Sequence, residues 1–476
     1  RVLTVGATNR TALLTAVRGA DPEGREAMAV VRNRTDTAQI LEVDTARLGA
    51  VAAWRSEYGP VTTLPEAVTA SSLTPLPLVT GDRLTLTARR EGDAAVALTL
   101  HLQHEATGQP VKVAFGTLRA GDQSLTAPVT GCTAAPGCRL VRWELTGPPR
   151  PDGGTRPAPA GAAVVLRGLG QGGAILDEAA LGDITRWRVG TTGAGIDLVA
   201  TGGTLRLSAD DNATEVDRVG TEVWATDRLL PLPALLAGPV PDRWRDDEAL
   251  LVGYGELAPV QVMGQVSALP AVGGSGLVVD LDSTRRLAAG ADPGGQFQVW
   301  LAPDARPGIV EALTAAGLTV TDDTDVARLA DRLGTQGPAV LVRFELLAGV
   351  AALLLAAAAV AVAATVDRRS LAEQLAALRL QGLPRRVAVS TGWAGTAALI
   401  LAGLSGGVLA ALLAVDVTGR TVPPFTDGWA VLAPPGPLDP VATVLAVATA
   451  LAVLGLTGRI ALQPLTRSLR DREARR

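Results

Sequence analysis

Histidine, cysteine and lysine are scarce in this sequence. It has 2 histidines and 2 cysteines, and Lys112 is its only lysine. No Gly-x-x-x-x-Gly-Lys-[Ser/Thr] segment occurs, which excludes a P-loop for nucleotide binding. With so few histidines and no cysteine beside one, the usual nucleophile–base pairs and four-ligand zinc sites lack their parts. We therefore expect a chain that is not an enzyme, with no catalytic residues, no metal site and no cofactor of its own.

The two histidines, His101 and His104, stand three residues apart in a segment that alternates apolar and polar residues like a strand. Side chains at this spacing point to opposite faces of a strand. We expect two surface histidines and not a metal-binding pair.

The distribution of charge divides the chain in two. The formal net charge is −4, which gives no reason to expect nucleic acid as a partner. Charges are scattered up to about Pro338, and three long uncharged stretches follow Leu346. Arginine supplies nearly all of the positive charge, and alanine and glycine are abundant, which is typical of GC-rich bacteria such as actinobacteria. The chain is too long for one compact core, so we expect two or three folded units.

The two cysteines lie close together in Gly131-Cys132-Thr133-Ala134-Ala135-Pro136-Gly137-Cys138. Proline and glycine between them favour a tight turn that brings the two sulfur atoms together. We favour a local Cys132–Cys138 disulfide, which implies an oxidising compartment. Two free thiols in a turn are the alternative.

Three uncharged runs are long enough to cross a bilayer, whose core needs about 20 helical residues. We expect spans at about 344–366, 387–415 and 440–462, with Trp393 near an interface and Arg459 reaching the headgroups. A buried helix of a soluble core is the alternative for each run, and three such runs in one short segment argue against it. The C-terminal part is therefore expected to be an α-helical transmembrane bundle.

Arginine is distributed unevenly around the expected spans. The connector between the first two spans and the tail, 464–476, are rich in arginine, whereas the loop before the third span holds only Arg420. Positive-inside counting puts these two segments in the cytoplasm and residues 1 to about 340 outside, in agreement with the disulfide. The chain begins at Arg1 without a signal-peptide pattern, so we expect an N-terminal transmembrane helix to be missing. The expected location is the bacterial cell membrane, crossed several times.

The connector, 367–386, carries the most informative pattern. Ser370 and Glu373 fit a capping box at a helix start, and Gly382 followed by Pro384 fits a helix stop. An apolar stripe at i, i+4 and i+7 is formed by Leu371, Leu375 and Leu378. We expect a short amphipathic helix at the cytoplasmic face. It could lie in the lipid headgroups, anchored by its arginines, or act as a lever that another protein grips, and the pattern does not choose between the two.

The order of elements over about residues 340–476 resembles the FtsX-like (MacB-type) ABC transporter permease domain. It consists of a span, the segment Arg-Arg-x-x-x-Glu-x-x-x-x-Leu-Arg-x-x-Gly-x-x-Arg-Arg, two more spans and a basic tail. The resemblance implies that the connector docks on a separate ABC ATPase and that two permeases or permease halves pair within the membrane lipid. The family's first span is absent here, which matches the missing helix. The coupling residues that it implies are Arg368, Arg369, Glu373, Leu375, Leu378, Arg379 and Gly382. Their leucines would fill a groove on the ATPase, and their arginines would pair with its carboxylates or with lipid phosphates.

The part before the spans reads as one α/β domain, over 1–72 and 216–338, which is split by an insert and resembles the periplasmic porter folds of MacB-type proteins at the level of fold. The segment Leu277–Asp280 leading into a helix echoes Leu41–Asp44 leading into another. The elements expected here are helix Arg10–Arg18, strands Ala27–Arg32 and Ile40–Val43, a helix from Thr45 to Trp54 capped by Asp44, strand Gln296–Leu301, helix Pro307–Ala316 and strand Leu318–Val320.

The insert, 73–215, is dominated by short alternating strand signals separated by turns such as Thr80-Gly-Asp82. This pattern is typical of a β-sandwich, and lectin-like jelly rolls share it, so glycan or peptide binding by the insert is conceivable. The expected strands are Arg83–Thr87, Ala95–Gln103, Val111–Phe115, Leu140–Leu145, Ala163–Arg167, Ile196–Val199 and Thr204–Leu207. The fold class is thus a multidomain α+β membrane protein, with a transmembrane domain over 339–476.

Two further kinds of residue could mark a site. Acidic clusters at Asp210–Glu215 and Asp322–Asp325 could hold calcium, but solvated turns or helix caps are several times more common. Trp187, Trp224 and Trp244 could line a binding surface, although isolated tryptophans usually belong to a core. The expected function is a permease subunit that couples ATP hydrolysis by its partner to movement of the outer domain. The alternative is a membrane-anchored binding or receptor protein that acts without an ATPase.

Overall fold

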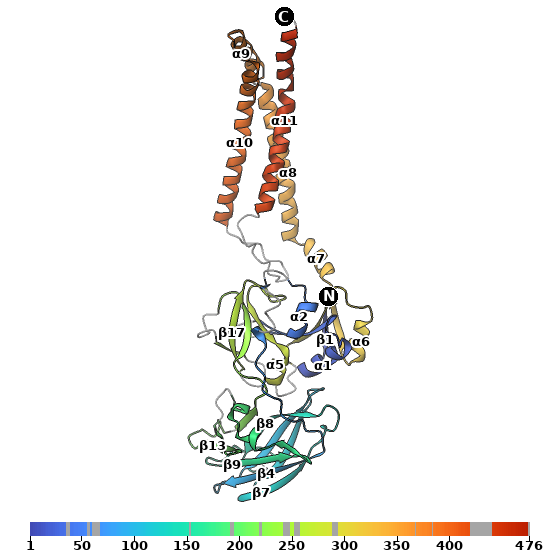
Figure 1. Ribbon diagram of the computed structural model, residues 1–476, viewed down its shortest axis with the longest axis vertical. Helices are drawn as coiled ribbons and strands as arrows, with labels where there is room; N and C mark the ends of the chain where they lie inside the picture. The colour runs from blue at the N-terminus through green and yellow to red at the C-terminus, as the bar shows by residue number, and fades with distance from the viewer. Residues whose placement is uncertain are drawn as a thin grey trace. The chain divides into compact units, whose positions relative to one another are not determined.

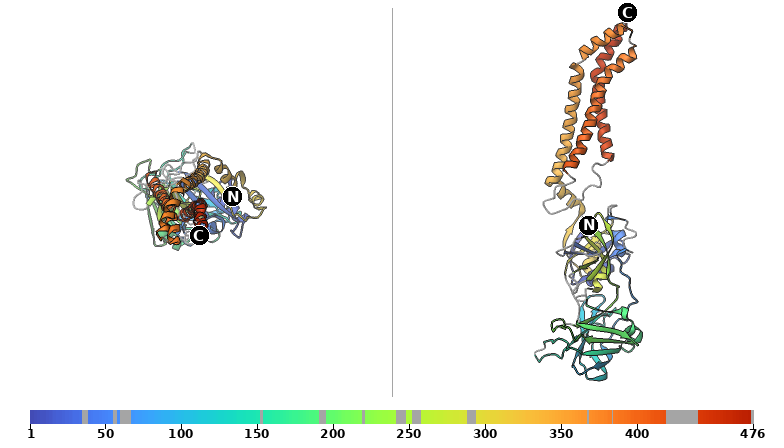
Figure 2. Two further views of the ribbon diagram at one scale, coloured as in Figure 1. Left: turned by 90° about the horizontal axis from the view of Figure 1, so that it is seen from above. Right: turned by 90° about the vertical axis from the view of Figure 1, so that its left-hand side faces the viewer.

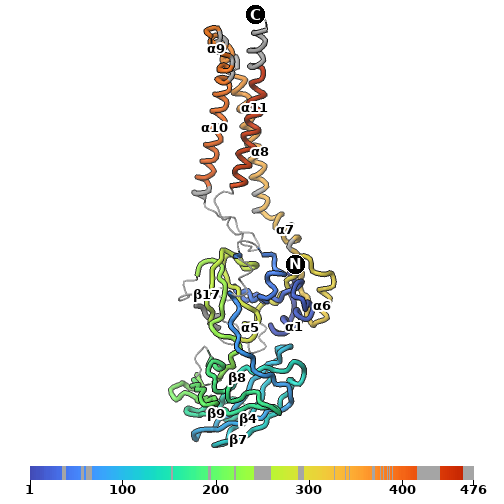
Figure 3. The backbone as a smooth tube through the Cα atoms, viewed as in Figure 1, coloured from blue at the N-terminus to red at the C-terminus, as the bar shows by residue number. Residues whose placement is uncertain are grey.

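The structure of the chain is a computed structural model, which describes residues 1–34, 39–54, 58–59, 67–151, 154–190, 195–218, 221–240, 248–251, 258–287, 294–366, 368–382, 384–418 and 440–474 (Figure 1 and Figure 3). The chain forms two compact units, Arg1–Val326 and Ala327–Arg476. The division falls before the expected boundary at 338, because helix α7 (Val326–Gly334) groups with the helices that follow it.

Two separate segments of the first unit build one mixed sheet of nine strands, here called the large sheet. Its strand order is β16-β17-β15-β18-β3-β2-β19-β1-β20. The strands are β1 (Val2–Gly6), β2 (Ala27–Arg34), β3 (Gln39–Val43), β15 (Leu232–Ala237), β16 (Glu248–Leu251), β17 (Ala258–Val266), β18 (Gly276–Asp280), β19 (Gln296–Leu301) and β20 (Thr319–Thr324). Residues from both sides of the insert therefore fold together, as the sequence predicts.

Both faces of the large sheet are covered around β2. Ala27, Ala29 and Val31 pack in one apolar core with helices α1 (Arg10–Ala20), α5 (Leu281–Leu287) and α6 (Ile309–Ala315). The alternate residues Met28 and Val30 pack in a second core with Leu48 and Val51 of α2 (Leu48–Val51). Successive side chains of a strand point to opposite faces, so cover on both sides makes Ala27–Val31 a continuous buried run.

The expected elements of this part are largely present, with two differences. Strand β1 was not predicted, because Val2–Gly6 is short and lacks turn residues before it. The helix expected from Thr45 to Trp54 is only a 3-10 turn, Thr45–Arg47, and α2. Asp44 makes no capping hydrogen bond; its carboxylate instead accepts hydrogen bonds from Arg18, at 3.1 and 3.0 Å. The tertiary ion pair with Arg18 thus takes the place of the predicted helix cap.

The two segments that echo each other in the sequence lie side by side. Strands β18 and β3 pair in parallel, with Leu277 opposite Ile40 and Asp280 opposite Val43. Beneath them, the buried guanidinium of Arg10 binds the buried carboxylate of Glu42 at two points, 2.8 and 2.9 Å. Thr284 of α5 donates a third hydrogen bond to Glu42, at 2.7 Å. A polar layer thus joins α1 and α5 to the centre of the large sheet.

The insert forms two antiparallel sheets, here called the two-sheet lobe. One has the order β12-β13-β9-β4-β7, with β10 on β9, and the other has the order β11-β14-β8-β5-β6. The strands are β4 (Arg83–Glu91), β5 (Ala97–His104), β6 (Pro110–Thr117), β7 (Gly121–Pro128), β8 (Cys138–Thr146), β9 (Ala163–Gly170), β10 (Ala174–Leu176), β11 (Trp187–Val189), β12 (Ile196–Thr201), β13 (Thr204–Ala209) and β14 (Thr221–Ala225). Leu86 and Leu166 from the first sheet share one core with Leu100 and Trp143 from the second.

The seven strands predicted for the insert all occur, and β7, β10, β11 and β14 are additional. Strand β14 lies beyond the expected boundary at 215 and pairs with β8, with Val223 opposite Trp143. The two-sheet lobe therefore extends to Ala225. Because β14 joins its sheet by pairing with a distant strand, the sequence around it does not show that it belongs to the insert.

The second unit is helical and has three long apolar helices that run side by side (Figure 2). They are α8 (Gly337–Val366), α10 (Arg385–Thr418) and α11 (Pro440–Ala474). Within them, Ala339–Val366, Arg386–Ala414 and Pro440–Pro464 are long and apolar enough to cross a membrane. Large apolar side chains such as Leu355 and Leu401 are exposed along these helices, as lipid-facing residues are. The three expected spans are present as helices, consistent with a membrane protein.

Candidate functional site

The connector between α8 and α10 contains helix α9 (Arg368–Leu380). The helix begins before Ser370, so the predicted capping box is wrong: Ser370 lies inside the first turn, and its hydroxyl accepts a 3.4 Å hydrogen bond from Gln374. The predicted stop is confirmed. Gly382 has a φ of 99°, a left-handed conformation that suits glycine, and Gln381 donates its N–H to the carbonyl of Leu378 at 3.1 Å.

Helix α9 packs against all three long helices. Leu371 packs against a small core formed by Ala364 of α8 and Leu462 of α11, and Trp393 of α10 packs against the same core. Leu375, one turn further, is only 2% exposed. The apolar stripe of the connector therefore begins inside the helical unit, because the neighbouring spans cover it. This differs from the expected placement of the leucines in a groove on a partner.

The other end of the stripe points outward. Leu378 is 45% exposed, and Glu373 is exposed as well. Arg368, Arg369 and Arg379 lie on the helical backbone of α9, but their side chains fall outside the described part of the structure. Among the coupling residues implied by the resemblance, Glu373 and Leu378 are thus exposed, while Leu375 anchors the helix to the spans.

A cavity of about 300 Å³ separates part of α9 from the spans. Its polar lining comes from Ser370 and Gln374 on α9 and from Thr391 and Thr396 on α10. Leu371 and Leu462 line it as well. Leu371, which packs against the spans, thus also borders this cavity.

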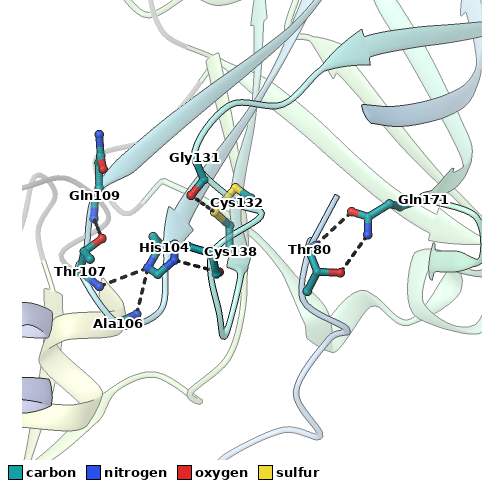
Figure 4. Close-up of a disulfide and its surroundings, with 10 residues drawn as sticks. Thr80, His104, Ala106, Thr107, Gln109, Gly131, Cys132, Cys138 and Gln171 are labelled. Atoms are coloured by element: carbon teal, nitrogen blue, oxygen red, sulfur yellow. Dashed lines mark hydrogen bonds between the residues drawn. A yellow bond between two sulfur atoms is a disulfide. The ribbon is translucent and has the colours of Figure 1, made fainter. Parts of the chain in front are cut away.

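The predicted disulfide is confirmed. Cys132 and Cys138 are bonded, with their Cα atoms 5.2 Å apart, and both are fully buried. Figure 4 shows the closed loop beside His104, whose Nε2 lies 3.2 Å from the carbonyl oxygen of Ala134 in that loop. Nδ1 of His104 accepts hydrogen bonds from the N–H groups of Ala106 and Thr107, at 3.2 and 3.3 Å.

Both histidines are buried, so the expectation of two surface histidines is wrong. His101 lies on β5, and its Nε2 is 2.6 Å from Oε2 of Glu144 on β8. This hydrogen bond, more than any other contact, lowers the pKa of Glu144. His101 and His104 serve different neighbours, and among the described residues no group of three His, Cys, Asp or Glu side chains could hold a metal ion.

The remaining candidates have structural roles where the structure describes them. The carboxylate of Asp210 accepts a hydrogen bond from the backbone of Asn212 in a turn, and Asp323 on β20 pairs with Arg1. Trp187 is buried in the core of the two-sheet lobe. Trp224 is also buried, and the guanidinium groups of Arg142 and Arg188 lie over its ring, 4.8 and 5.2 Å from the ring centre. Trp244 falls outside the described residues.

A partly buried group of charges, which the sequence did not predict, joins the two-sheet lobe to the large sheet. It comprises Glu105 in the turn after β5, Arg139 on β8, Asp227 and Arg228 in the returning chain, and Asp282, Arg285 and Arg286 on α5, and is here called the junction cluster. The sequence pattern Asp282-x-x-Arg285-Arg286 is one from which ion pairs within a helix could have been predicted. The residues of other segments that pair with this helix could not be predicted from the sequence, because they lie up to about 180 residues away.

The ion pairs of the junction cluster cross between the two lobes. Nη1 of Arg285 lies 3.2 Å from Glu105, and Nη1 of Arg286 lies 2.8 Å from Asp227. Burial tends to raise the pKa of Asp282, but Arg285 and Arg286 outweigh this and lower it well below its ordinary value. Burial lowers the pKa of the Arg139 guanidinium, which is 5% exposed. Burial also tends to lower the pKa of the Arg286 guanidinium, but Asp227, Glu105 and Asp282 outweigh this and raise it.

Comparison of this chain with protein-family models, with curated proteins and with solved structures finds no match.

Proposed function

We propose that the chain is the permease subunit of an ABC system of the FtsX-like (MacB-type) kind, in which a separate ATPase moves the connector and the spans carry that movement to the first unit. In this proposal the large sheet is the porter-like domain, and the two-sheet lobe is its jelly-roll-like insert. Both lie outside the cytoplasm. The chain itself catalyses nothing, and it pairs with a second permease or permease half within the lipid.

The observation that carries the proposal is the placement of α9. One face of this helix packs on α8, α10 and α11 together, the opposite face carries Glu373, and the exposed end of the apolar stripe carries Leu378. A rigid helix in contact with three spans displaces all three when it is pushed, because packed interiors transmit strain. Close packing through Leu371 and Leu375 therefore favours a lever over a helix that merely floats in the headgroups.

The first experiment is co-purification of the native chain in detergent with the ABC ATPases of its own host. A Glu373→Lys, Arg379→Glu double variant reverses two charges on α9. The matched control is a Glu91→Arg, Arg206→Glu double variant, which reverses an exposed ion pair of 3.0 Å in the two-sheet lobe. We expect one ATPase to follow the native chain and the control, and to be lost from the α9 variant.

Two outcomes would count against the coupling proposal. If no ATPase follows a well-folded native chain, the anchored receptor without an ATPase becomes the better proposal. If an ATPase follows all three chains equally, its contact lies elsewhere, and α9 is not the lever.

A further inference from the structure

The cavity between α9 and the spans has a volume of about 300 Å³. An apolar cavity of about 150 Å³ in another protein takes up one benzene ring, so this space is large enough for part of an alkyl chain. Its walls include the small residues Ala363 and Ala364 of α8 and Gly392 and Gly395 of α10. Among the described residues, no side chain of another helix lies within 4 Å of the position that a Cβ on Gly395 would take. Small side chains on two spans therefore leave this space open.

The α8 and α9 walls of the cavity reach from the depth of the hydrocarbon to the depth of the headgroups. The uncharged run of α8 ends at Val366, and such a run fills the hydrocarbon core. Val360 lines the cavity less than two turns before that end, about 9 Å deeper in the membrane. Ser370 and Gln374 line it from α9, beyond the end of the run. The apolar wall is thus deep, and the polar wall is shallow.

Helix α10 gives the cavity the same polarity. Thr391 lies less than two turns after the start of α10 at Arg385, and Leu399 lies about two turns deeper in the span. Thr396 lies between them. Leu399 is 55% exposed, so the wall that it forms borders the space that lipid occupies around the spans. The cavity therefore has a rim on the lipid side, through which an amphiphile can enter sideways.

The described lining is uncharged. Its polar groups are the hydroxyls of Ser370, Thr391 and Thr396 and the amide of Gln374. An ionised group that leaves water without a partner is costly, whereas a hydroxyl or an ester is accepted where it finds hydrogen bonds. Nε2 of Gln374 makes only a long hydrogen bond, of 3.4 Å, to the hydroxyl of Ser370, which a ligand hydroxyl can replace. The lining thus favours an uncharged polar head over an anion or a cation.

We propose that this cavity binds an uncharged amphiphile with one alkyl chain, such as a monoacylglycerol. The chain lies between Val360 and Leu399, and the glycerol hydroxyls form hydrogen bonds with Ser370 and Gln374. The proposal goes beyond ATP-driven coupling. It depends neither on an ATPase nor on the side of the membrane at which α9 lies, because every group involved belongs to the helical unit.

The test uses the full chain in nanodiscs of phosphatidylcholine. The probe is a decanoyl monoacylglycerol with a photoreactive diazirine in its chain, and two comparison probes carry the same chain on a carboxylate and on a phosphatidylcholine. Mass spectrometry of peptides locates the cross-links. We expect the monoacylglycerol to label 360–364 and 391–399 at least about tenfold more strongly than either comparison probe at equal mole fraction. An excess of unlabelled monoacylglycerol should abolish this labelling.

Three variants locate the site. Gly395→Leu fills the cavity, and we expect it to lower the labelling by the monoacylglycerol at least about tenfold. Its matched control is Gly403→Leu, which adds the same side chain at an exposed glycine about two turns further along α10, outside the described lining, and leaves the labelling unchanged. Gln374→Leu keeps the size of the side chain and removes the amide. It should reduce the labelling by the monoacylglycerol to the level of the phosphatidylcholine probe.

The proposal is overturned if the carboxylate or the phosphatidylcholine probe labels the same residues as strongly as the monoacylglycerol, or if unlabelled monoacylglycerol does not compete. It is overturned as well if Gly395→Leu is labelled like the native chain. Circular dichroism of each variant in nanodiscs shows whether it is folded. Where Gly395→Leu is not, Gln374→Leu decides, because its side chain is exposed on α9. Loss of the ATPase in the co-purification experiment would leave these labelling results unaffected.

Discussion

The hydroxyl of Thr45 donates a 2.7 Å hydrogen bond to Oδ1 of Asp280, which lies 235 residues further along the chain. The other oxygen of Asp280 accepts hydrogen bonds from the N–H and the hydroxyl of Ser283, at 2.9 and 2.8 Å. Asp280 thus caps α5 and ties it to the segment after β3. Burial of the carboxylate raises its pKa in spite of these hydrogen bonds.

We expect Asp280→Asn to keep the free energy of unfolding at pH 7 within about 1 kcal/mol of the native value, and Asp280→Ala to lose about 1–3 kcal/mol. A raised folded pKa means that the contribution of Asp280 is complete below its ordinary value of 3.8 and is lost as the pH rises through the folded pKa. Asparagine is neutral, so the native chain should lose stability relative to Asp280→Asn between pH 4 and pH 7. Urea unfolding followed by tryptophan fluorescence measures this difference, and a difference that does not change with pH would contradict the prediction.

Asp282, two residues later, should behave in the opposite way. Its pKa is lowered by Arg285 and Arg286, so its contribution is present above the ordinary value of 3.8 and is lost as the pH falls through the folded pKa. We expect Asp282→Asn to lose about 3 kcal/mol at pH 7, because it leaves partly buried arginines short of a partner. The loss should shrink as the pH is lowered from 5 to about 2 in the same assay. An equal loss at both ends of this range would show that hydrogen bonding, and not charge, is responsible.

Reduction of the Cys132–Cys138 disulfide should destabilise the two-sheet lobe by about 2–3 kcal/mol, since opening even a short loop enlarges the unfolded ensemble. The measurement is urea unfolding of the native chain with and without a reductant, with thiol titration to show that the bond has opened. A Cys132→Ser, Cys138→Ser double variant is the control and should not respond to the reductant. A fully reduced native chain of unchanged stability would refute the prediction.

Leu375 and Leu378 of α9 should separate anchoring from partner binding. Leu375 is 2% exposed and Leu378 45% exposed, so Leu375→Ala opens a cavity and Leu378→Ala does not. We expect Leu375→Ala to cost about 2–4 kcal/mol locally and to speed hydrogen exchange over 368–380. Leu378→Ala should leave the exchange unchanged and weaken retention of the ATPase. Equal exchange in both variants would mean that the packing of α9 on the spans contributes nothing to its stability.

The expected orientation in the membrane can be tested with single cysteines at exposed positions. Thr201→Cys lies on β12 of the first unit, and Gln381→Cys lies just after α9. The native cysteines are bonded and do not react with maleimide. A membrane-impermeant maleimide should label Thr201→Cys in intact cells and Gln381→Cys only after lysis. The reverse pattern would invert the orientation derived from the arginine distribution.

Where residues depend mainly on their neighbours in the chain, the sequence determined the outcome. The three apolar helices follow from long uncharged runs, the end of α9 follows from Gly382, and the disulfide follows from two cysteines in one turn. Strands Ala27–Arg34 and Gln296–Leu301 were readable because both have clear apolar patterns between turns. In each case the physical cause is local: hydropathy, backbone freedom or a short loop.

Tertiary structure alone decided how distant segments meet. Asp44 pairs with Arg18 in place of a cap, and β14 joins the sheet of an insert beyond its expected boundary. Leu375 is buried in a helix, α9, that packs on all three spans. The junction cluster draws charges from four segments, and the ion pairs between them exist in none of these segments alone. Burial and ion pairing depend on which surfaces come together, and a linear sequence does not fix that choice until the chain has folded.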